Sequence, residues 1–384
     1  MIKLFQKKPY FFVLFIFWFF SGVLFSQSQE RYFDTAELNS KEVRLAILHP
    51  TVGSIRTLVE LRNQGFITLD DLIVIGVYHE KELTNFKASI SYVARKKLEW
   101  FKFHKLSGEL TKDNLFQKNP HTTDFEQIFK KSDGIIFFGG ADIPPIIYKK
   151  KTSILTRIST PYRHFLELSC VFHLLGGTQD KNFKAFLESR PQYPVLGICL
   201  GCQSLNIGTG GTLIQDIPFE KYKKKYLEDV IAIGKENWHT NPLARLYPEE
   251  RLAPINMHPI KLLKDGKFCT ELGFNKDDTP YILSAHHQMV DKKGKGIKII
   301  ATSLDGKVVE AIEHDSYPNV LGVQFHPESP SLWDRGLKLR FTLEENEGKS
   351  LRSILEDNPP SFDFHKKIWA WLSQKLKEYH DNKK

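Results

Sequence analysis

Short apolar runs alternate with segments of helical spacing over the first half of the chain. A short apolar run bounded by turn residues is typical of a buried strand, whereas apolar residues three and four apart indicate one face of a helix. Runs of the first kind are Val43–Leu48, Leu72–Val77, Trp100–Leu106, Gly134–Phe138 and Pro194–Ile198. Segments of the second kind are Ser54–Asn63, Glu80–Leu98, Thr123–Lys131, Tyr162–Leu175, Phe183–Ser189 and Leu200–Gly208. The alternation predicts a parallel sheet covered on both faces, with ligands beyond the carboxyl ends of the strands.

Strand patterns dominate the second half, up to residue 325. Thr212–Ile217 is predicted to return as a strand after the helix that ends at Gly210-Gly211, and the charged, turn-rich stretch Phe219–Pro254 predicts an excursion over the surface. The later apolar runs are Ile255–Leu262, Tyr281–Leu283, Ile297–Thr302, Lys307–Ile312 and Val320–Phe325. Turns at Asp305-Gly306 and Pro318-Asn319 predict that the last of these strands form β-hairpins.

The two ends of the chain differ from this pattern. Residues 1–28 begin with lysines, continue with the uncharged apolar run Tyr10–Phe25 and end in small and polar residues, which predicts an export signal cleaved after Ser26 or Ser28. An uncleaved N-terminal membrane anchor is the alternative, although the run is shorter than the ~20 residues of a membrane-spanning helix. Residues 29–41 are predicted to be a linker, 42–330 the main domain, and 331–384 a loop followed by a C-terminal helix on the same domain.

The C-terminal helix is predicted to begin at a cap formed by Asp363. Its apolar face is formed by Phe364, Ile368, Trp371, Leu372 and Tyr379. An aromatic stripe at helical spacing indicates packing on a core rather than a ligand site.

Composition and charge add little to this picture. The chain of 384 residues has a formal charge of +9, of which Lys3, Lys7 and Lys8 contribute three units, so the remainder is dispersed. No basic block interleaved with aromatic residues indicates a nucleic-acid partner. The four cysteines are Cys170, Cys199, Cys202 and Cys269, too few and too scattered for a disulfide framework.

Cys199 stands at the turn from an apolar strand into a helix, in the stretch Val195–Gln203 (VLGICLGCQ). A thiol at a helix N-terminus is favoured as the thiolate, with a pKa that can fall from ~8.5 to roughly 3.5–7.5. This pattern predicts a nucleophile. Two other interpretations stay open, namely a buried structural cysteine and a dithiol redox site formed with Cys202.

His326 and Glu328 supply the partners that a cysteine nucleophile needs. They follow the apolar strand that ends in Gly322–Phe325, and residues two apart on an extended segment point to the same side. Glu328 can therefore orient the imidazole while the other ring nitrogen meets the thiol. Donors for a developing oxyanion are expected from the backbone N–H groups of Leu200 and of Gly140, or Gly139; a plain tight turn is the alternative at the two glycines.

Three strings together resemble the signature segments of the class I glutamine amidotransferase-like superfamily: GICLGCQ, LGVQFHPE and FFGGADIPPIIY. More narrowly, GGADIPP, GGTLIQDIP and SAHHQMV resemble the gamma-glutamyl hydrolase branch, peptidase family C26, and its gamma-glutamyl-gamma-aminobutyrate hydrolase-like members. The resemblance covers about residues 43–328 and the last helix. It implies an α/β fold, a flavodoxin-like three-layer sandwich with a mostly parallel central sheet, a nucleophile elbow and added β-hairpins.

The resemblance also implies residue roles. Cys199 is the nucleophile, His326 the base and Glu328 the orienting acid, while residues placed near the bound glutamyl group are Gly139, Asp142, Gln203 and His286. Two features depart from the family pattern. His164 stands where relatives carry an aspartate, so the substrate pocket is expected to differ, and the segments Phe219–Pro254 and Ser331–Pro360 are longer than the compact domain needs.

The resulting hypothesis is an exported cysteine hydrolase that cleaves gamma-glutamyl amide bonds through a thioester, with no metal and no cofactor in the chemistry. One alternative is a glutaminase that passes ammonia to a partner synthase. Another is a binding or sensor module on the same fold. The expected partner is a small gamma-glutamyl molecule, with no nucleic acid, membrane contact only through the N-terminal segment, and a homodimer left open; the leaving group stays unassigned.

Overall fold

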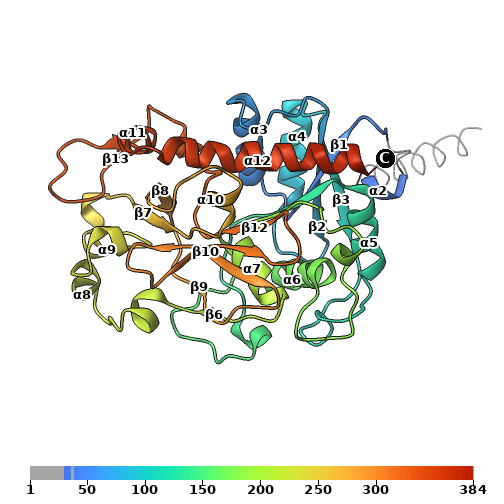
Figure 1. Cartoon of the computed structure of the whole chain (residues 1–384), viewed down its shortest axis with the longest axis horizontal. Coiled ribbons are helices and arrows are strands. Elements are labelled where there is room, and N and C mark those ends of the chain that lie inside the picture. The colour runs from blue at the N-terminus through green and yellow to red at the C-terminus, as the bar shows by residue number, and fades with distance from the viewer. Residues whose placement is uncertain (1–29, 36–38, 384) are drawn as a thin grey trace, which may run out of the picture.

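A ten-stranded sheet runs through the protein in the order β3-β2-β1-β4-β5-β12-β11-β10-β7-β8, as the computed structural model shows (Figure 1). The structure describes residues 30–35 and 39–383. The strands are β1 (Val43–Leu48), β2 (Leu72–His79), β3 (Phe101–Leu106), β4 (Gly134–Phe137), β5 (Val195–Ile198), β7 (Asn256–Leu262), β8 (Tyr281–Ser284), β10 (Ile297–Ser303), β11 (Val309–His314) and β12 (Val320–Val323). The predicted α/β fold with a mostly parallel central sheet is therefore confirmed.

The six strands from β3 to β12 are all parallel, and their buried residues follow from that position. Every residue of β1, β4, β5 and β12 is buried, because helices cover both faces of this half of the sheet. β5 lies between β4 and β12, with Ile198 opposite Val323. The carboxyl ends of these three strands therefore meet at one edge.

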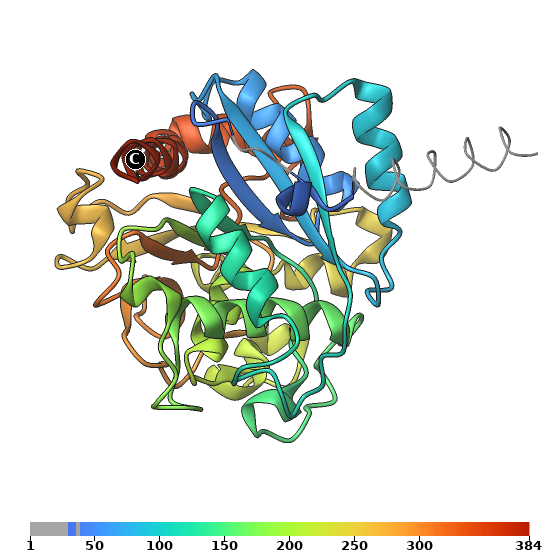
Figure 2. The same cartoon turned by 90° about the vertical axis from the view of Figure 1, so that its right-hand side faces the viewer.

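Among the described residues, six longer helices form the two outer layers. One face is covered by α3 (Val52–Asn63), α4 (Phe86–Lys96) and α12 (Ser361–Asn382), and the other by α5 (Thr122–Lys131), α6 (Pro161–Leu175) and α7 (Leu200–Gly208). Figure 2 shows this layering with α12 seen nearly end on. Leu58 and Trp369 pack in the core of the first face, and Phe125 and Leu205 in that of the second. The molecule is a three-layer sandwich.

The other end of the sheet is antiparallel. β12 pairs with β11, and β11, β10, β7 and β8 continue in antiparallel order, so the predicted hairpins are confirmed. Two small sheets are formed by β6 (Leu213–Ile214) with β9 (Met289–Val290), and by β13 (Lys338–Leu339) with β14 (Lys349–Ser350). The remaining short α-helices are α2 (Tyr32–Thr35), α8 (Leu227–Ile231), α9 (Pro242–Leu246), α10 (Lys267–Thr270) and α11 (Leu351–Asp357).

Several predicted boundaries were wrong. Residues 80–85 are not helical, because α4 begins only after Asn85, whose side chain caps it. The predicted helix Phe183–Ser189 is a single turn, Phe186–Glu188, and the predicted strand Thr212–Ile217 is reduced to the two residues of β6. Asp363 is not the cap of the C-terminal helix. It lies inside the first turn of α12, which begins at Ser361.

The expected export signal, residues 1–28, lies outside the described residues. Within the predicted linker, Phe33 is fully buried and its ring meets that of His104 on β3. In the part of the chain that the structure describes, no helix combines the length and the apolar character needed to cross a bilayer.

Candidate active site

Cys199 occupies a strained turn between β5 and α7. Its φ of 52° and ψ of −102° are rare for a residue with a side chain, and they turn the strand directly into the helix. The turn packs tightly on β4, since a Cβ at Gly201 would lie 2.0 Å from the carbonyl oxygen of Phe137. Cys199 also donates its backbone N–H to the carbonyl of Val323, at 2.8 Å. These contacts hold the thiol at the N-terminus of α7.

His326 and Glu328 follow the adjacent strand β12 at the same edge. Nδ1 of His326 lies 2.8 Å from Oε1 of Glu328, and the backbone N–H of His326 donates to the carbonyl of Leu283 at 3.0 Å. Burial lowers the pKa of His326, but the Glu328 carboxylate and the Cys199 sulfur outweigh it and raise that pKa well above its ordinary value. The structure thus brings the three predicted residues together and favours an imidazolium next to the sulfur.

A second side chain contacts the thiol. Nε2 of Gln324, the first residue after β12, lies 3.8 Å from Sγ of Cys199. Its Oε1 lies 3.4 Å from Nε2 of Gln203, and that amide also lies 3.4 Å from the carbonyl oxygen of Gln288. Gln203 therefore reaches the site through Gln324, a residue that sequence reasoning did not single out although it lies within the His326 segment.

The glycine turn after β4 lies against the cysteine and the histidine. A Cβ at Gly139 would lie 2.9 Å from Cε1 of His326 and 3.5 Å from Cβ of Cys199. Gly140 is equally confined, because a Cβ there would lie 2.2 Å from Nη1 of Arg163 and 2.9 Å from Cδ2 of Leu200. Only glycine fits this close approach at both positions.

Arg163 orients that turn from helix α6. Its Nη2 donates to the carbonyls of Phe138 and Gly139, at 3.0 and 2.9 Å, and its Nε donates to the buried carboxylate of Glu167 at 2.8 Å. In a trans peptide the N–H points opposite to the C=O. The N–H of Gly140 therefore points away from Arg163. The N–H of Leu200, the first residue of α7, has no carbonyl acceptor within its own helix.

Asp142 belongs to a group of three ionisable side chains beside the turn. Nε2 of His287 lies 3.0 Å from Oδ2 of Asp142, and its Nδ1 lies 3.3 Å from Oδ2 of Asp216. Burial lowers the pKa of His287, but its bonds to Asp142 and Asp216 raise it to about 9. Asp216 also lines a cavity of about 340 Å³ with Tyr226 and Arg245.

His286 faces a different direction from its neighbour His287. Its Nδ1 bonds the carbonyl of Gln288 at 2.9 Å, and its Nε2 lies 3.6 Å from Oε2 of Glu310, in the interior. The structure does not bring His286 together with Cys199 and His326. His286 is joined to the site indirectly, because its Nδ1 and the side-chain amide of Gln203 both approach the carbonyl oxygen of Gln288.

His164 is fully buried in α6, and neither of its ring nitrogens has a hydrogen-bond partner among the described residues. Burial, with the nearby Arg163 and His49, lowers its pKa to about 3, so the ring is neutral. The ring therefore lies in the core and does not form part of an exposed pocket wall.

Cys202 lies one helical turn after Cys199 and is fully buried. Burial raises its pKa well above the ordinary value, and nearby Cys199 and Glu310 act in the same direction. All four cysteines are free thiols in the structure. A thiol that stays protonated is a poor partner for disulfide exchange, so the environment of Cys202 does not favour the dithiol alternative.

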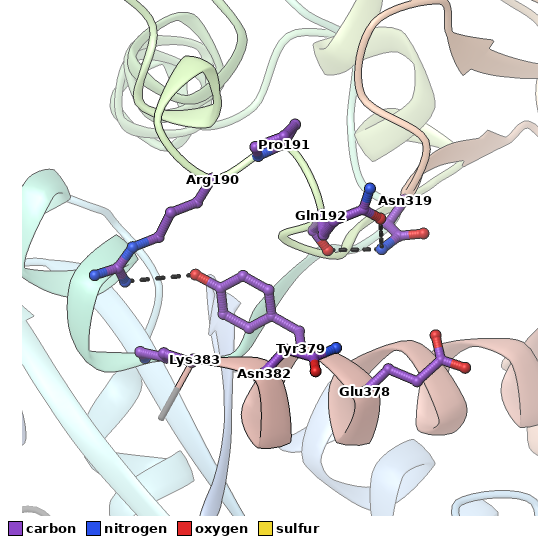
Figure 3. Close-up of a pocket in the computed structure, with 8 residues that line it drawn as sticks. All are labelled: Arg190, Pro191, Gln192, Asn319, Glu378, Tyr379, Asn382 and Lys383. Atoms are coloured by element: carbon purple, nitrogen blue, oxygen red, sulfur yellow. Dashed lines mark hydrogen bonds between the residues drawn. The ribbon is translucent and has the colours of Figure 1, made fainter.

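A cavity of about 400 Å³ lies at the opposite edge of the sheet (Figure 3). Gln192 and Asn319, which precede β5 and β12, line it together with Tyr379 near the end of α12. Asn319 donates to the carbonyl of Gln192 at 2.6 Å, and Arg190 contacts the hydroxyl of Tyr379 at 3.4 Å. The first bond joins the segments that precede β5 and β12, and the second joins α12 to the segment before β5; the nucleophile candidate lies at the other end of β5.

Comparison with known proteins places the site in a recognised group. The sequence model of the Peptidase C26 family matches residues 114–328. A glutamine amidotransferase-like protein of Rickettsia prowazekii is 32% identical over 247 residues, which cover 58% of this chain and 79% of that protein. A glutamine amidotransferase-like protein of Lactococcus lactis is 31% identical over 196 residues, 51% of this chain and 66% of the relative. A glutamine amidotransferase of Mycobacterium tuberculosis is 29% identical over 194 residues, half of each chain.

Proposed function

The chain belongs to the peptidase C26 family of class I glutamine amidotransferase-like proteins, and from this premise we propose that it is a cysteine hydrolase of gamma-glutamyl amide bonds. The family match spans residues 114–328 and so includes every residue of the candidate site. The observation that carries the proposal is the arrangement of Cys199 on a strained turn, with His326 and Glu328 just after the adjacent strand β12. In this arrangement the carboxylate holds the histidine and the histidine faces the cysteine, as nucleophilic acyl transfer requires.

The proposed reaction starts from the imidazolium of His326 beside the sulfur of Cys199, taken as the thiolate. The sulfur of Cys199 attacks the gamma-carbonyl carbon, and the electron pair of the C=O bond moves to oxygen, where the N–H groups of Gly140 and Leu200 stabilise the charge. The C–N bond then breaks, and His326 gives its proton to the departing amine. Water, deprotonated by His326, attacks the thioester, releases the glutamyl acid and restores the thiolate.

Arg163 has a positioning role in this proposal. By holding the carbonyls of Phe138 and Gly139, it keeps the N–H of Gly140 directed away from itself before substrate arrives. Donors oriented in advance need no reorganisation when charge develops on the substrate oxygen.

The gamma-glutamyl end is proposed to lie beside Gln324, whose amide adjoins the sulfur, and Gln203, whose amide contacts that of Gln324. The cavity that Asp216 and Tyr226 line is joined to the glycine-turn segment by the contacts of His287 with Asp216 and Asp142, and it is proposed to hold the leaving group. The cavity is lined by both aromatic and cationic side chains, including Phe219, Lys224 and Lys225.

Paired isomers test the substrate class. Gamma-Glu-X and alpha-Glu-X dipeptides at equal concentration are expected to differ in kcat/KM by ~10⁴ or more, because the wrong isomer leaves buried polar groups unpaired. Cys199→Ala protein is the control for contaminating peptidases. Comparable rates on both isomers would overturn the gamma-glutamyl assignment and leave the cysteine mechanism standing.

The same assay separates the alternative functions. A glutaminase that serves a synthase would release ammonia from glutamine faster than amines from gamma-glutamyl amides. A binding module would turn over neither, although its Cys199 could still react with a glutamine-like electrophile.

We also propose that the chain is exported through residues 1–28. Support comes only from the lysines and the apolar run Tyr10–Phe25 that follows them. Intact-mass analysis of protein from its native host is expected to give a chain that starts after Ser26 or Ser28. A chain that begins at Met1 in the cytosolic fraction would contradict this proposal.

A further inference from the structure

Three imidazoles and one carboxylate meet in the interior of the antiparallel half of the sheet. His258 lies on β7, Glu310 on β11, His286 between β8 and β9, and His239 shortly before α9. Their exposed fractions are 0%, 0%, 4% and 4%. Such a set of ionisable groups in the core is rare unless its members are paired or bind an ion.

All three rings approach the same carboxylate. Nδ1 of His239 lies 3.1 Å from Oε1 of Glu310, Nε2 of His258 lies 3.9 Å from that oxygen, and Nε2 of His286 lies 3.6 Å from Oε2. None of these contacts is aligned as a hydrogen bond. Both carboxylate oxygens and the facing nitrogens have no hydrogen-bond partner among the described residues.

The outer nitrogens of two rings determine which atoms face inward. Nδ1 of His258 lies 3.1 Å from the carbonyl oxygen of Pro259, and Nδ1 of His286 lies 2.9 Å from that of Gln288. A carbonyl can only accept, so each Nδ1 carries the proton. In the neutral ring, Nε2 then presents a lone pair to Glu310.

The carboxylate has no other charged partner to balance it. Glu310 is fully buried, and its ion-pair contacts among the described residues are all with these three histidines. Acceptor atoms that face one another in the interior are unfavourable unless a cation or a proton lies between them.

We propose that this cluster binds one divalent transition-metal ion of the Zn²⁺ class, with His239, His258 and Glu310 as ligands and His286 as the fourth. Bonds of about 2.0–2.1 Å in a tetrahedral site set ligand atoms about 3.3 Å apart. The distances from Oε1 of Glu310 to His239 and His258, 3.1 and 3.9 Å, bracket that value, and His286 lies 3.6 Å from the other oxygen. Ligand atoms of His239, His258 and Glu310 all lie within 4.8 Å of one another. Histidine ligands that donate their other N–H to a carbonyl are typical of metal sites.

The ion would be structural, because no step of the proposed hydrolysis passes through it. His239 belongs to the excursion Phe219–Pro254, so the site would fasten that segment to β7 and β11. Two hydrogen bonds already hold this segment against β8 and the residues after it. The carbonyl of His239 accepts from Oγ of Ser284 at 2.9 Å and from the N–H of His286 at 3.2 Å. The carbonyl of Gln288 joins the cluster to Gln203 beside the nucleophile.

Metal content is the direct test, and it does not depend on hydrolysis. The experiment uses full-length Cys199→Ser protein, because a thiolate next to His326 could bind Zn²⁺ itself. The protein is stripped with a chelator, incubated with Zn²⁺ or Co²⁺, desalted and analysed by atomic emission. One ion per chain is expected, with the intense visible absorption of tetrahedral Co²⁺, and a thermal midpoint raised by roughly 4 °C at a hundredfold excess over Kd.

Two variants and a control locate the ion. Glu310→Gln keeps the shape of the side chain and removes its charge, and His258→Ala removes a ring; each is expected to lower Zn²⁺ affinity at least tenfold. His365→Ala removes an equally buried ring outside the cluster and is expected to retain one ion per chain. Because this control also loses packing, it separates loss of metal from loss of stability.

Two outcomes would overturn the proposal. Less than about 0.1 ion per chain, with a midpoint that depends on pH and not on Zn²⁺, would mean that a proton compensates Glu310. One ion per chain retained in both Glu310→Gln and His258→Ala would place the metal elsewhere.

Discussion

Nδ1 of His326 lies 2.8 Å from Oε1 of Glu328, so the ring is held by one nitrogen and its Nε2 is left for the sulfur of Cys199. The carboxylate acts on this ring in two ways, since it selects the tautomer and raises the pKa of His326 against the effect of burial. The first effect directs Nε2 toward the sulfur, and the second favours the imidazolium form of the ring.

Glu328→Gln should weaken the effects of the carboxylate on His326 while leaving Cys199 in place. We expect kcat to fall by ~10²–10⁴, because the amide cannot stabilise the imidazolium. The pKa of His326 should drop, so the alkaline limb of the rate profile moves to lower pH. Alkylation of Cys199 by iodoacetamide, measured across pH, reports the same change without substrate. An unchanged pH profile would contradict the orienting role.

The two neighbouring cysteines should respond differently to substitution. Cys199→Ala is expected to lower kcat at least 10⁴-fold, because the nucleophile is lost. Cys202→Ala should retain most of the activity, since that thiol is buried and its pKa is raised. Equal losses, together with disulfide exchange by the unmodified protein, would restore the dithiol interpretation.

Arg163→Met should lower kcat by ~10–100-fold with a much smaller change in KM, because the glycine turn loses the guanidinium that holds its carbonyls. Arg163→Lys should recover little, since one ammonium cannot replace the fork that also reaches Glu167. Arg190→Met is the matched control at the opposite edge of the sheet (Figure 3) and should keep full activity. A rise in KM alone would assign Arg163 to substrate binding.

His287 should make the free energy of unfolding depend on pH. Its folded pKa of about 9 is above the ordinary 6.5, so its contribution is fully present below pH 6.5, declines from there to about 9, and is lost above that value. The rise in the pKa of His287 corresponds to about 3 kcal/mol of unfolding free energy. Urea unfolding at pH 6 and pH 9.5 should show this loss in the parent protein and a smaller one in His287→Gln.

The control for that measurement is His365→Gln. Burial lowers the pKa of His365 to about 4, so its ring is neutral throughout the window. The substitution should lower stability at both pH values and leave the difference between them unchanged. If His287→Gln and the parent lose the same unfolding free energy between pH 6 and pH 9.5, His287 is not the group responsible for the loss.

Two buried tryptophans on α12 form a matched pair. Nε1 of Trp369 donates to the carbonyl of Pro327, between His326 and Glu328, at 3.1 Å, whereas Nε1 of Trp371 has no hydrogen-bond partner among the described residues. Trp369→Phe is expected to lower kcat severalfold and stability by about 1–2 kcal/mol. Trp371→Phe should change stability alone. Equal kcat in both variants would mean that α12 does not position the triad.

The sequence predicted the parts of the site that depend on short-range geometry. His326 and Glu328 are two residues apart on an extended segment, and Cys199 stands at a strand-to-helix turn, so local spacing was sufficient. Arg163 was not predicted as the residue that orients the glycine turn, because it reaches Gly139 from a helix 24 residues away in the chain. Only the packing of α6 on β4 reveals that contact.

The directions of His286 and His287 also required the fold. Both lie in the string SAHHQMV, and the pattern alone cannot tell which ring faces Asp142 and which faces Glu310. Polar residues within apolar runs were an available signal for the interior cluster: His258 and Glu310 each interrupt a predicted strand. Helix ends were predicted least well, as at Asp363, because caps depend on the path of the preceding chain.

The contact between α12 and β1 affects the order in which parts of the structure can form during synthesis. His380 near the end of α12 bonds Asp133, which precedes β4, and the carbonyl of Ser40, so the last helix closes on the first part of the chain. Contacts of such long sequence separation form late. A nascent chain that still lacks α12 also lacks the indole that holds Pro327. Cys199 is therefore synthesised well before α12 can hold the His326 loop in place, so the arrangement of Cys199, His326 and Glu328 is completed late in synthesis.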